Sequence, residues 1–397
     1  MSAQEAFAEP GGRDKGRSPE GGAPAQAGDG KLRLVYLDGL RAVAAGYVVM
    51  FHAVPGFSAH ELTGAWRVLR RALAFGHEAV AIFIVLSGYC LMLPVVRQRP
   101  EQLSVELGRF LKRRALRILP PYFAALAGSI GLIASFASLR ARSGTTWDDS
   151  LPGLDAGAIL SHLLVVHNWS PTWGYQINGP LWSVASEWQI YFFFPLVLLP
   201  VWRRFGMLVA LMLAASLGFA PLLLWRGPAH VASPWYLLLF TFGMVAAAIG
   251  FSPEALATRL RSHVRWGHGC AGLWLGCFTF SMGAPQVWFS NKPVVDVLVG
   301  LFTMTLLIHL THCAATGVSS RVLGVLESRP LVRLGHFSYS LYLTHLPVLA
   351  LCYFFLRDFG WSVGLRSLAL LGLGSVVSLI VAYGFHLLVE RPFLLRR

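Results

Sequence analysis

Residues 233–251 read SPWYLLLFTFGMVAAAIGF, a run without a single charged side chain. About 20 consecutive apolar residues are what a helix needs to cross the hydrocarbon core of a bilayer. The whole chain is similarly apolar: 55% of its 397 residues are hydrophobic and only 13% are charged. Soluble domains are about 25% charged. The sequence therefore predicts an all-α, polytopic membrane protein and argues against a water-soluble enzyme.

Segments of this kind recur along the chain and predict about ten transmembrane helices. The ten spans lie at 36–55, 78–96, 117–137, 181–201, 206–225, 233–251, 269–286, 294–313, 337–356 and 367–389. The first is the least hydropathic, because Asp38, Arg41 and His52 interrupt it. A further apolar stretch at 156–167 is too short to span and is predicted to be a packed or re-entrant piece.

The chain divides into three predicted regions. Residues 1–33 hold almost no aliphatic side chain beyond alanine, so they cannot bury a core and are predicted to form a disordered cytoplasmic tail. This segment also lacks the apolar core of a signal peptide. Residues 34–393 form the predicted transmembrane domain, and 394–397 form a short cytoplasmic C-terminal end.

The basic residues predict the orientation in the membrane. The formal net charge is +14, from 33 Lys and Arg against 19 Asp and Glu. With the N-terminus inside, the inner segments hold 23 of these basic residues and the outer segments hold nine. Cytoplasmic loops carry such an excess, so both termini are predicted to face the cytoplasm. A nucleic-acid binder would spread its basic residues over a polar surface, and this sequence argues against that class.

Metal and nucleotide sites find no support in the sequence. All five cysteines lie inside or at the edge of apolar segments, without the spacing of a zinc site or a disulfide framework. They are interpreted as packing residues. No glycine-rich loop typical of ATP-driven pumps occurs. We therefore expect no metal and no tightly bound cofactor.

Ionisable side chains at membrane depth are costly and are functional candidates by default. Asp38, Arg41 and His52 of the first span project within about 60° of one another on a helix. Asp38 and Arg41 are three residues apart and can pair. His52 lies roughly 16 Å further along the axis than Arg41, so the two are predicted to serve different parts of one pocket. The alternative is a structural ion pair with a satisfied histidine.

A basic cluster precedes the third span on its inner side. Such clusters commonly anchor a helix to anionic lipid head groups. The functional alternative is capture of a phosphorylated cosubstrate, for which guanidinium groups are well shaped. Arg114 and Arg117 are about one helical turn apart and could hold the same anion. The members of the cluster are Arg109, Lys112, Arg113, Arg114 and Arg117, followed by Tyr122.

Spans four and nine also carry polar groups. Glu187 is a lone carboxylate, with Ser183 and Tyr191 one turn away on either side. It needs a partner or a proton, and Arg41, His52 and His345 are the proposed alternatives. In span nine, Ser338, Tyr342 and His345 share one helical face; a structural role for this histidine is as well supported as a catalytic one. Asp296 ranks lower, because it lies near an interface and can meet water.

These stretches, in this order, resemble the acyltransferase-3 family of integral-membrane acyltransferases from about residue 34 to residue 393. Tyr89 stands where the family often has Phe, which is a mild departure. The matching motifs are LDGLRAVAAGYVVMFH with its arginine–ten residues–histidine pattern, AIFIVLSGYC (81–90), RRALRILPPY, NGPLWSVASEW, LGHFSYSLYLTHLP and VERPF.

The resemblance implies transfer of an acyl group, frequently acetyl, from cytosolic acyl-CoA to a hydroxyl of a sugar, a cell-envelope polysaccharide or a macrolide. An alcohol needs a base in the transition state, and neutral histidine suits this near pH 7. His52 is the candidate base, and Arg41 and Glu187 are the other catalytic candidates. The expected acyl-CoA-binding residues are Arg113, Arg114, Arg117 and Tyr122, and the expected substrate-binding or supporting residues are Asp38, Ser183, Tyr342 and His345.

Direct transfer is favoured over a covalent acyl-enzyme. Cys90 is the one cysteine beside these motifs at a polar position, and Ser87 in the LSGY turn is interpreted as a helix-packing residue. The tail composition suits a bacterial source, which predicts the inner membrane as the location. Two other classes stay open: a multi-span transporter or permease of a small polar or lipid-linked substrate, and a sensor that binds without chemistry. The acceptor, the acyl length and a possible homo-oligomer also stay open.

Overall fold

The computed structural model describes residues 34–54, 64–97, 106–151 and 154–394, and this part of the chain contains helices and no strand. The predicted tail at 1–33 and residues 395–397 lie outside it. Eight helices of the described part are long and apolar enough to cross a membrane. The prediction of an all-α, polytopic membrane protein is therefore confirmed.

Most predicted spans coincide with single helices. These are α3 (Gly76–Arg97), α4 (Leu107–Ser135), α8 (Met207–Leu224), α10 (Tyr236–Phe251), α14 (Lys292–Thr316) and α17 (Ser338–Arg357). Two further spans are composite, because π-helical turns interrupt them. The first comprises α6 (Leu181–Phe193), η5 (Phe194–Leu198) and α7 (Leu199–Phe205). The second comprises α18 (Val363–Ala369), η6 (Leu370–Gly374), α19 (Ser375–Phe385), η7 (His386–Glu390) and α20 (Arg391–Leu394).

Two of the ten predicted spans form helices that are less apolar than these eight. They are α1 (Tyr36–Ala53) and α12 (Trp266–Gly283). Asp38 and Arg41 lower the hydropathy of α1, and glycines with His268 lower that of α12. The sequence thus predicted both helices, and α1 packs within the bundle against α3, α17 and the short α16 (Arg329–His336).

Short helices and turns connect the long ones. The apolar stretch at 156–167 forms α5 (Ala156–Leu163), which at eight residues is too short to span, as predicted. The other connecting elements are α2 (Ala65–Ala72), η2 (Ala137–Arg140), η3 (Thr146–Ser150), η4 (His167–Trp169), α9 (Arg226–Ala232), α11 (Ala255–His263), α13 (Pro285–Ser290) and α15 (Arg321–Leu326).

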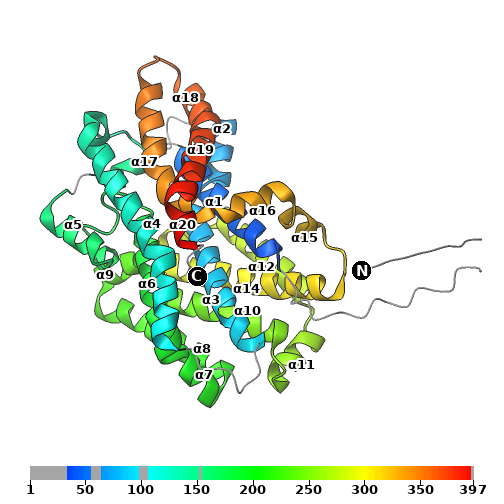
Figure 1. The fold of residues 1–397 in the computed structure, drawn as a ribbon. Coiled ribbons are helices and arrows are strands. Elements are labelled where there is room, and N and C mark those ends of the chain that lie inside the picture. Colours follow the sequence, from blue (N-terminus) through cyan, green and yellow to red (C-terminus); the bar gives the residue numbers. More distant parts are fainter. Residues whose placement is uncertain (1–33, 55–63, 98–105, 152–153, 395–397) are drawn as a thin grey trace, which may run out of the picture. The chain divides into compact units, whose positions relative to one another are not determined.

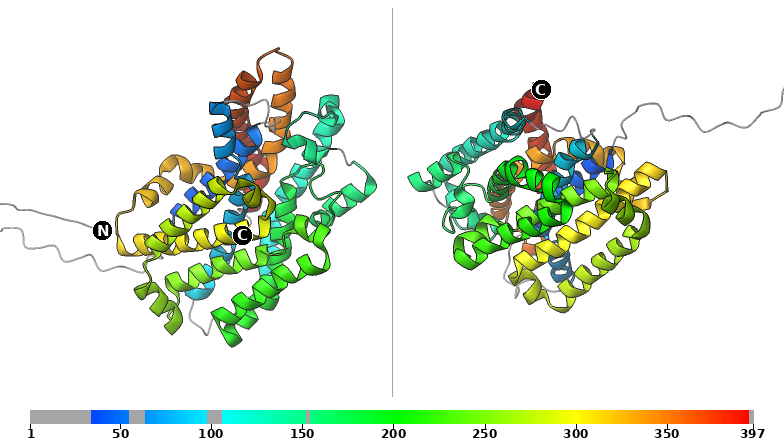
Figure 2. Two further views of the ribbon diagram at one scale, coloured as in Figure 1. Left: turned by 180° about the vertical axis from the view of Figure 1, so that it is seen from behind. Right: turned by 90° about the horizontal axis from the view of Figure 1, so that it is seen from below.

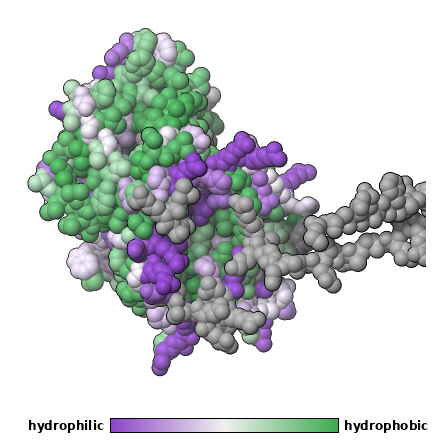
Figure 3. Space-filling model, in the orientation of Figure 1, coloured by the Kyte–Doolittle hydropathy of each residue, from purple (hydrophilic) through white to green (hydrophobic). Residues whose placement is uncertain are grey.

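Within residues 34–394, the helices form one bundle in which α3 lies centrally, between α4 and α6 on one side and α10 and α14 on the other (Figure 1). The views from behind and from below show α4 along the outside of this bundle (Figure 2). A broad hydrophobic surface covers the upper part of the face drawn in Figure 3, where α4, α17 and α19 lie, and hydrophilic residues gather below it. Exposed side chains such as Val376 and Ile380 of α19 suit contact with lipid tails.

Two glycines allow α3 and α10 to cross closely, as small residues do between membrane helices. A Cβ on Gly88 would lie 1.9 Å from the carbonyl oxygen of Phe240, and one on Gly243 would lie 1.9 Å from that of Val85. Because backbone atoms form both contacts, the helices would have to separate to admit a methyl group. This crossing fixes α3, which carries residues of the site described below.

We therefore expect Gly243→Ala to destabilise the protein by about 1–3 kcal/mol, the usual cost of overpacking a core. The measurement is the melting temperature of the detergent-solubilised protein. Gly276→Ala on α12 is the matched control, because a Cβ there meets nothing within 4 Å. Equal melting temperatures for the two variants would contradict the close crossing.

Candidate active site

Three adjoining cavities follow one another along α1 and α17, which both line each of them. The middle cavity encloses about 100 Å³. It shares Arg41 and Arg117 with a cavity of about 330 Å³, here named the inner cavity, which His336 and Arg391 also line. It shares Val80 and Tyr342 with a cavity of about 300 Å³, here named the outer cavity. The outer cavity is also lined by His52, His77, Asp149, Trp182 and Lys292.

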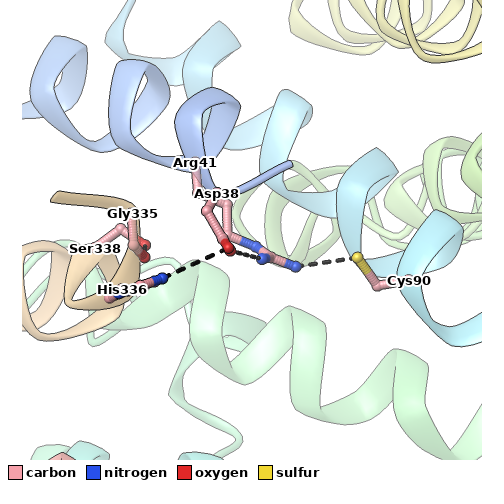
Figure 4. Close-up of polar contacts among 6 residues, drawn as sticks. All are labelled: Asp38, Arg41, Cys90, Gly335, His336 and Ser338. Atoms are coloured by element: carbon pink, nitrogen blue, oxygen red, sulfur yellow. Dashed lines mark hydrogen bonds and ion pairs between the residues drawn. The ribbon is translucent and has the colours of Figure 1, made fainter. Parts of the chain in front are cut away.

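Arg41 lines both the inner and the middle cavity, and Figure 4 shows its contacts with Asp38 and Cys90. One guanidinium nitrogen donates to Asp38 Oδ1 at 2.7 Å, which is the pair that the three-residue spacing predicted. The other donates to Cys90 Sγ at 3.0 Å, and His336 Nε2 approaches Asp38 Oδ2 at 3.8 Å. Gly335 permits this contact of α1 with α16, because a Cβ there would lie 2.1 Å from the carbonyl oxygen of Asp38.

The basic cluster of α4 divides between the cavity and the surface. Arg114 and Arg117 both line the middle cavity, so the helix brings together the two arginines that the sequence paired. Arg113 is exposed and Arg109 pairs with Glu106 at 2.8 Å on the surface. Tyr122 lies apart from the described cavities, since its buried hydroxyl donates to the carbonyl oxygen of His162 at 2.9 Å. Two of the four expected acyl-CoA-binding residues therefore meet at the cavity.

Glu187 lies in the middle cavity, where it bonds to Tyr191 one turn away and to Ser87, a partner that the sequence did not indicate. Its Oε1 accepts hydrogen bonds from Ser87 and from Tyr191. No ion pair in the described part of the chain involves Glu187, so the expected pairing with Arg41, His52 or His345 is not found. Ser87 was interpreted as a packing residue; its hydroxyl instead faces the cavity, because α3 turns that side toward α6.

Tyr342 connects the middle and outer cavities, which it lines together with Val80. Its hydroxyl and the Ser183 hydroxyl are 2.7 Å apart. The same helix, α17, carries His345 one turn further along. Two expected supporting residues, Ser183 and Tyr342, thus lie in contact between Glu187 on one side and the histidines on the other.

His52 and His345 form a hydrogen-bonded pair between α1 and α17. His345 Nε2 and His52 Nδ1 are 3.2 Å apart. His345 is fully buried, whereas His52 is half-buried and lines the outer cavity. A pair of residues 293 positions apart is beyond what helical spacing can predict.

Backbone carbonyls determine which nitrogen of each ring carries the proton. His345 Nδ1 lies 2.9 Å from the carbonyl oxygen of Tyr342, and His52 Nδ1 lies 2.9 Å from that of Val48. Carbonyl oxygens only accept, so both Nδ1 atoms are donors. His52 Nδ1–H is then shared between Val48 and His345 Nε2. The neutral His52 ring is left with an unprotonated Nε2, which is the nitrogen that a general base uses.

The outer cavity contains a second pair, which sequence reasoning missed. His77 Nε2 lies 3.0 Å from Asp296 Oδ2, and Asp296 is fully buried. The expectation that Asp296 meets water at an interface is therefore wrong, because α3 and α10 cover this part of α14. A carboxylate inside an apolar span was the available signal, but its partner is 219 positions away.

The described residues contain no group of three or more His, Cys, Asp or Glu side chains that could hold a metal ion. All five cysteines are free in the described part of the chain. The chemical groups that line the three cavities are guanidinium groups, the Lys292 ammonium, carboxylates, hydroxyls, imidazoles and the Cys90 thiol. This set suits binding of an anion in the inner cavity and proton transfer in the outer cavity.

Outside the spans, α5 and η4 bury a stacked histidine pair. His162 and His167 are both fully buried, with ring centroids 3.8 Å apart. Burial lowers the pKa of His162, and burial together with the neighbouring His162 ring lowers the pKa of His167 well below its usual value. Both rings are therefore neutral at pH 7 in the folded protein.

This pair predicts that stability falls in acid. Below about pH 6.5 the unfolded chain binds protons that the folded pair does not, so the free energy of unfolding drops by up to about 1.4 kcal/mol per pH unit for each histidine. The melting temperature at pH 7 and pH 5 measures this. The variant His167→Phe should flatten the dependence, and exposed His268→Gln is the control. An unchanged dependence in His167→Phe would contradict the assignment.

The chain is similar to known acyltransferases over most of its length. The sequence model of an acyltransferase domain matches residues 34–387. The Streptomyces mycarofaciens protein named acyltransferase MdmB is 28% identical over 392 residues, covering 91% of this chain and 92% of its own length. The peptidoglycan O-acetyltransferase OatA of Listeria monocytogenes is 24% identical over 348 residues, which cover 79% of this chain but 49% of OatA. No solved structure matches the chain.

Proposed function

This chain belongs to the acyltransferase-3 family, and from that premise we propose that it transfers an acyl group, acetyl foremost, from cytosolic acyl-CoA to a hydroxyl of a sugar, polysaccharide or macrolide. It is a multi-pass membrane acyltransferase, and its proposed location is the bacterial inner membrane. The observation that carries the proposal is the pair of contacts at His52 Nδ1, to the Val48 carbonyl and to His345. These contacts leave Nε2 unprotonated, and the His52 ring lines the outer cavity.

The proposed reaction begins with proton transfer to His52. An acceptor hydroxyl in the outer cavity gives its proton to Nε2 as its oxygen attacks the thioester carbonyl. The imidazolium that forms still donates Nδ1–H to Val48 and to His345, and these two acceptors stabilise the new charge. The tetrahedral intermediate then expels CoA as a thiol, with the proton returned by His52, and the acyl ester is the other product.

The donor is proposed to enter from the inner side. CoA carries several phosphates, and guanidinium groups bind phosphate well. Arg117 and Arg41 line both the inner and the middle cavity, and Arg114 lines the middle one. Arg41 and His52 are separated by about 16 Å along α1, so the thioester arm would extend through the middle cavity past Glu187 and Tyr342 to reach the base.

Glu187 and its neighbours are proposed to support this passage. The carboxylate opposes the positive charge of Arg41 and Arg114 around the same cavity. Its bonds to Ser87 and Tyr191 hold it on one wall. No nucleophilic side chain is needed, because the acceptor hydroxyl is proposed to attack the thioester directly. Asp38 is proposed to hold Arg41 in position at the entrance.

A transporter or permease would also need connected cavities through the bundle. The matches to acyltransferases and the polarised His52–His345 pair favour the enzyme. Consumption of a thioester by purified protein separates the two classes, because a transporter leaves acyl-CoA intact.

The direct experiment incubates the purified protein in detergent with acetyl-CoA and longer acyl-CoAs, together with monosaccharides, polysaccharide fragments and macrolides. Free thiol reports donor consumption, and mass spectrometry identifies the acylated acceptor. We expect acceptor-dependent thiol release and an acyl ester. Intact acyl-CoA under every acceptor, in protein shown to be folded, would contradict the proposed function.

A further inference from the structure

A groove of about 640 Å³ lies between α11, α12 and α14 and shares no lining residue with the three cavities of the candidate active site. α12 packs against α14 at the edge of the bundle, and α11 packs against α10 (Figures 1 and 2). Among the described residues, no Asp or Glu lines this groove. Its ionisable lining residues are Arg261, Arg265, His268, His309 and His312.

The two arginines of the groove differ in the contacts that they already make. Arg261 donates to the carbonyl oxygens of Ile249 and Ser252 at the end of α10. The exposed side chain of Arg265 makes no hydrogen bond or ion pair with another described residue. A guanidinium group carries five N–H donors, so Arg265 can bind an anion without losing an existing contact.

His309 and His312 of α14 face the start of α12 across the groove. Gly267 allows this approach, because a Cβ there would lie 3.1 Å from Cε1 of His309. Each imidazole supplies at least one N–H donor in either protonation state. The start of α12, a helix of 18 residues, adds a partial positive charge. The groove therefore favours an anionic group through several donors of different kinds.

An exposed apolar stripe continues from the groove along α12. Ala271 lines the groove, and Trp274 and Phe278 follow at spacings of three and seven residues, so the three share one helical face. Trp274 and Phe278 are 56% and 49% exposed, and their rings stack with centroids 5.5 Å apart. A soluble anion would leave these rings uncovered, whereas the acyl tails of a phospholipid would cover them.

We propose that this groove binds an anionic phospholipid, with its phosphate held by Arg265, His309 and His312 and its tails lying over Trp274 and Phe278. The predicted orientation places the connection between α11 and α12 on the cytoplasmic side. Basic pockets between membrane helices on that side suit anionic head groups. The site is separate from the proposed acyl transfer and does not depend on it.

The test uses two photoactivatable phospholipids with the same diazirine acyl chain, one with a phosphatidylglycerol head group and one with a phosphatidylcholine head group. The purified full-length protein in detergent is irradiated with each, and mass spectrometry of its peptides measures the labelling of α12. We expect the anionic probe to label α12 about tenfold more strongly, as one or more hydrogen bonds to a charged group imply. Unlabelled phosphatidylglycerol should compete with the probe, whereas phosphatidylcholine and inorganic phosphate should not.

The double variant Arg265→Gln, His312→Gln should reduce labelling by the anionic probe to the level of the phosphatidylcholine probe. Both side chains are exposed, so the variant should fold, and its melting temperature checks this. Arg259→Gln is the matched control, because Arg259 is exposed on α11 and does not line the groove.

Three results would overturn the proposal: equal labelling of wild type by the two probes, undiminished labelling of the folded double variant, or displacement of the anionic probe by inorganic phosphate. If the double variant does not fold, the ratio of labelling by the two probes on wild type decides. None of these results depends on acetyl-CoA consumption, so a failure of the proposed function is scored separately.

Discussion

Replacing His52 with Ala is expected to lower the rate of acyl transfer by about 10²–10⁴-fold, the range that a general base contributes. The loss follows from the position of the ring, whose Nε2 is the unprotonated nitrogen of a side chain that lines the outer cavity. Because His52 is half-buried at the end of α1, the variant should still fold. Thiol release from acetyl-CoA in the presence of acceptor measures the effect.

Two further variants make this result specific. His345→Ala removes the ring that receives His52 Nδ1–H but leaves the Val48 carbonyl as an acceptor, so its loss should be smaller than that of His52→Ala. His336→Ala changes an exposed histidine at the inner cavity and should leave the chemical step unchanged. A folded His52→Ala protein with the full rate of wild type would exclude His52 as the base.

The second large effect is expected at Arg41. Arg41→Gln should raise KM for acetyl-CoA about 10–100-fold, because hydrogen bonds to charged groups contribute about 1.5–3 kcal/mol each. The residue lines both the inner and the middle cavity, where the CoA phosphates are proposed to lie. Steady-state kinetics with acetyl-CoA as the varied substrate measure the change.

Arg113→Gln is the matched control for Arg41→Gln, because Arg113 is exposed on α4 and lines none of the three cavities. Arg41→Gln also leaves Asp38 without its partner, so the double variant with Asp38→Asn separates this structural cost from donor binding. If KM for acetyl-CoA stays at the wild-type value in both Arg41 variants, Arg41 does not bind the donor.

Much of the architecture could be predicted because membrane helices are determined locally. Hydropathy located each long helix, from α3 through α19, since every span must satisfy its own backbone hydrogen bonds. Helical spacing likewise paired Asp38 with Arg41 and brought Arg114 and Arg117 together. In each case the residues lie within one turn of the same helix, where sequence distance fixes spatial distance.

Contacts between helices could not be predicted in the same way. Glu187 was expected to meet a cation, but α3 brings the Ser87 hydroxyl to it instead. The pairs His52–His345 and His77–Asp296 join residues more than 200 positions apart, and one sequence does not encode which helices are neighbours. The glycine crossing of α3 and α10 aligns the α3 residues of the site; the LSGY element predicted helix packing there but did not identify α10 as the partner.

The central claim is that a donor on the cytoplasmic side supplies an acyl group to a hydroxyl activated by His52. The most direct measurement compares acetyl-CoA consumption by inverted and right-side-out membrane vesicles that contain wild type or His52→Ala, since acetyl-CoA does not cross a sealed membrane. We predict thiol release with wild type in inverted vesicles, none in right-side-out vesicles until they are permeabilised, and release at least about 100-fold slower with His52→Ala. Equal consumption by sealed vesicles of both orientations, or undiminished consumption by His52→Ala, would contradict the claim.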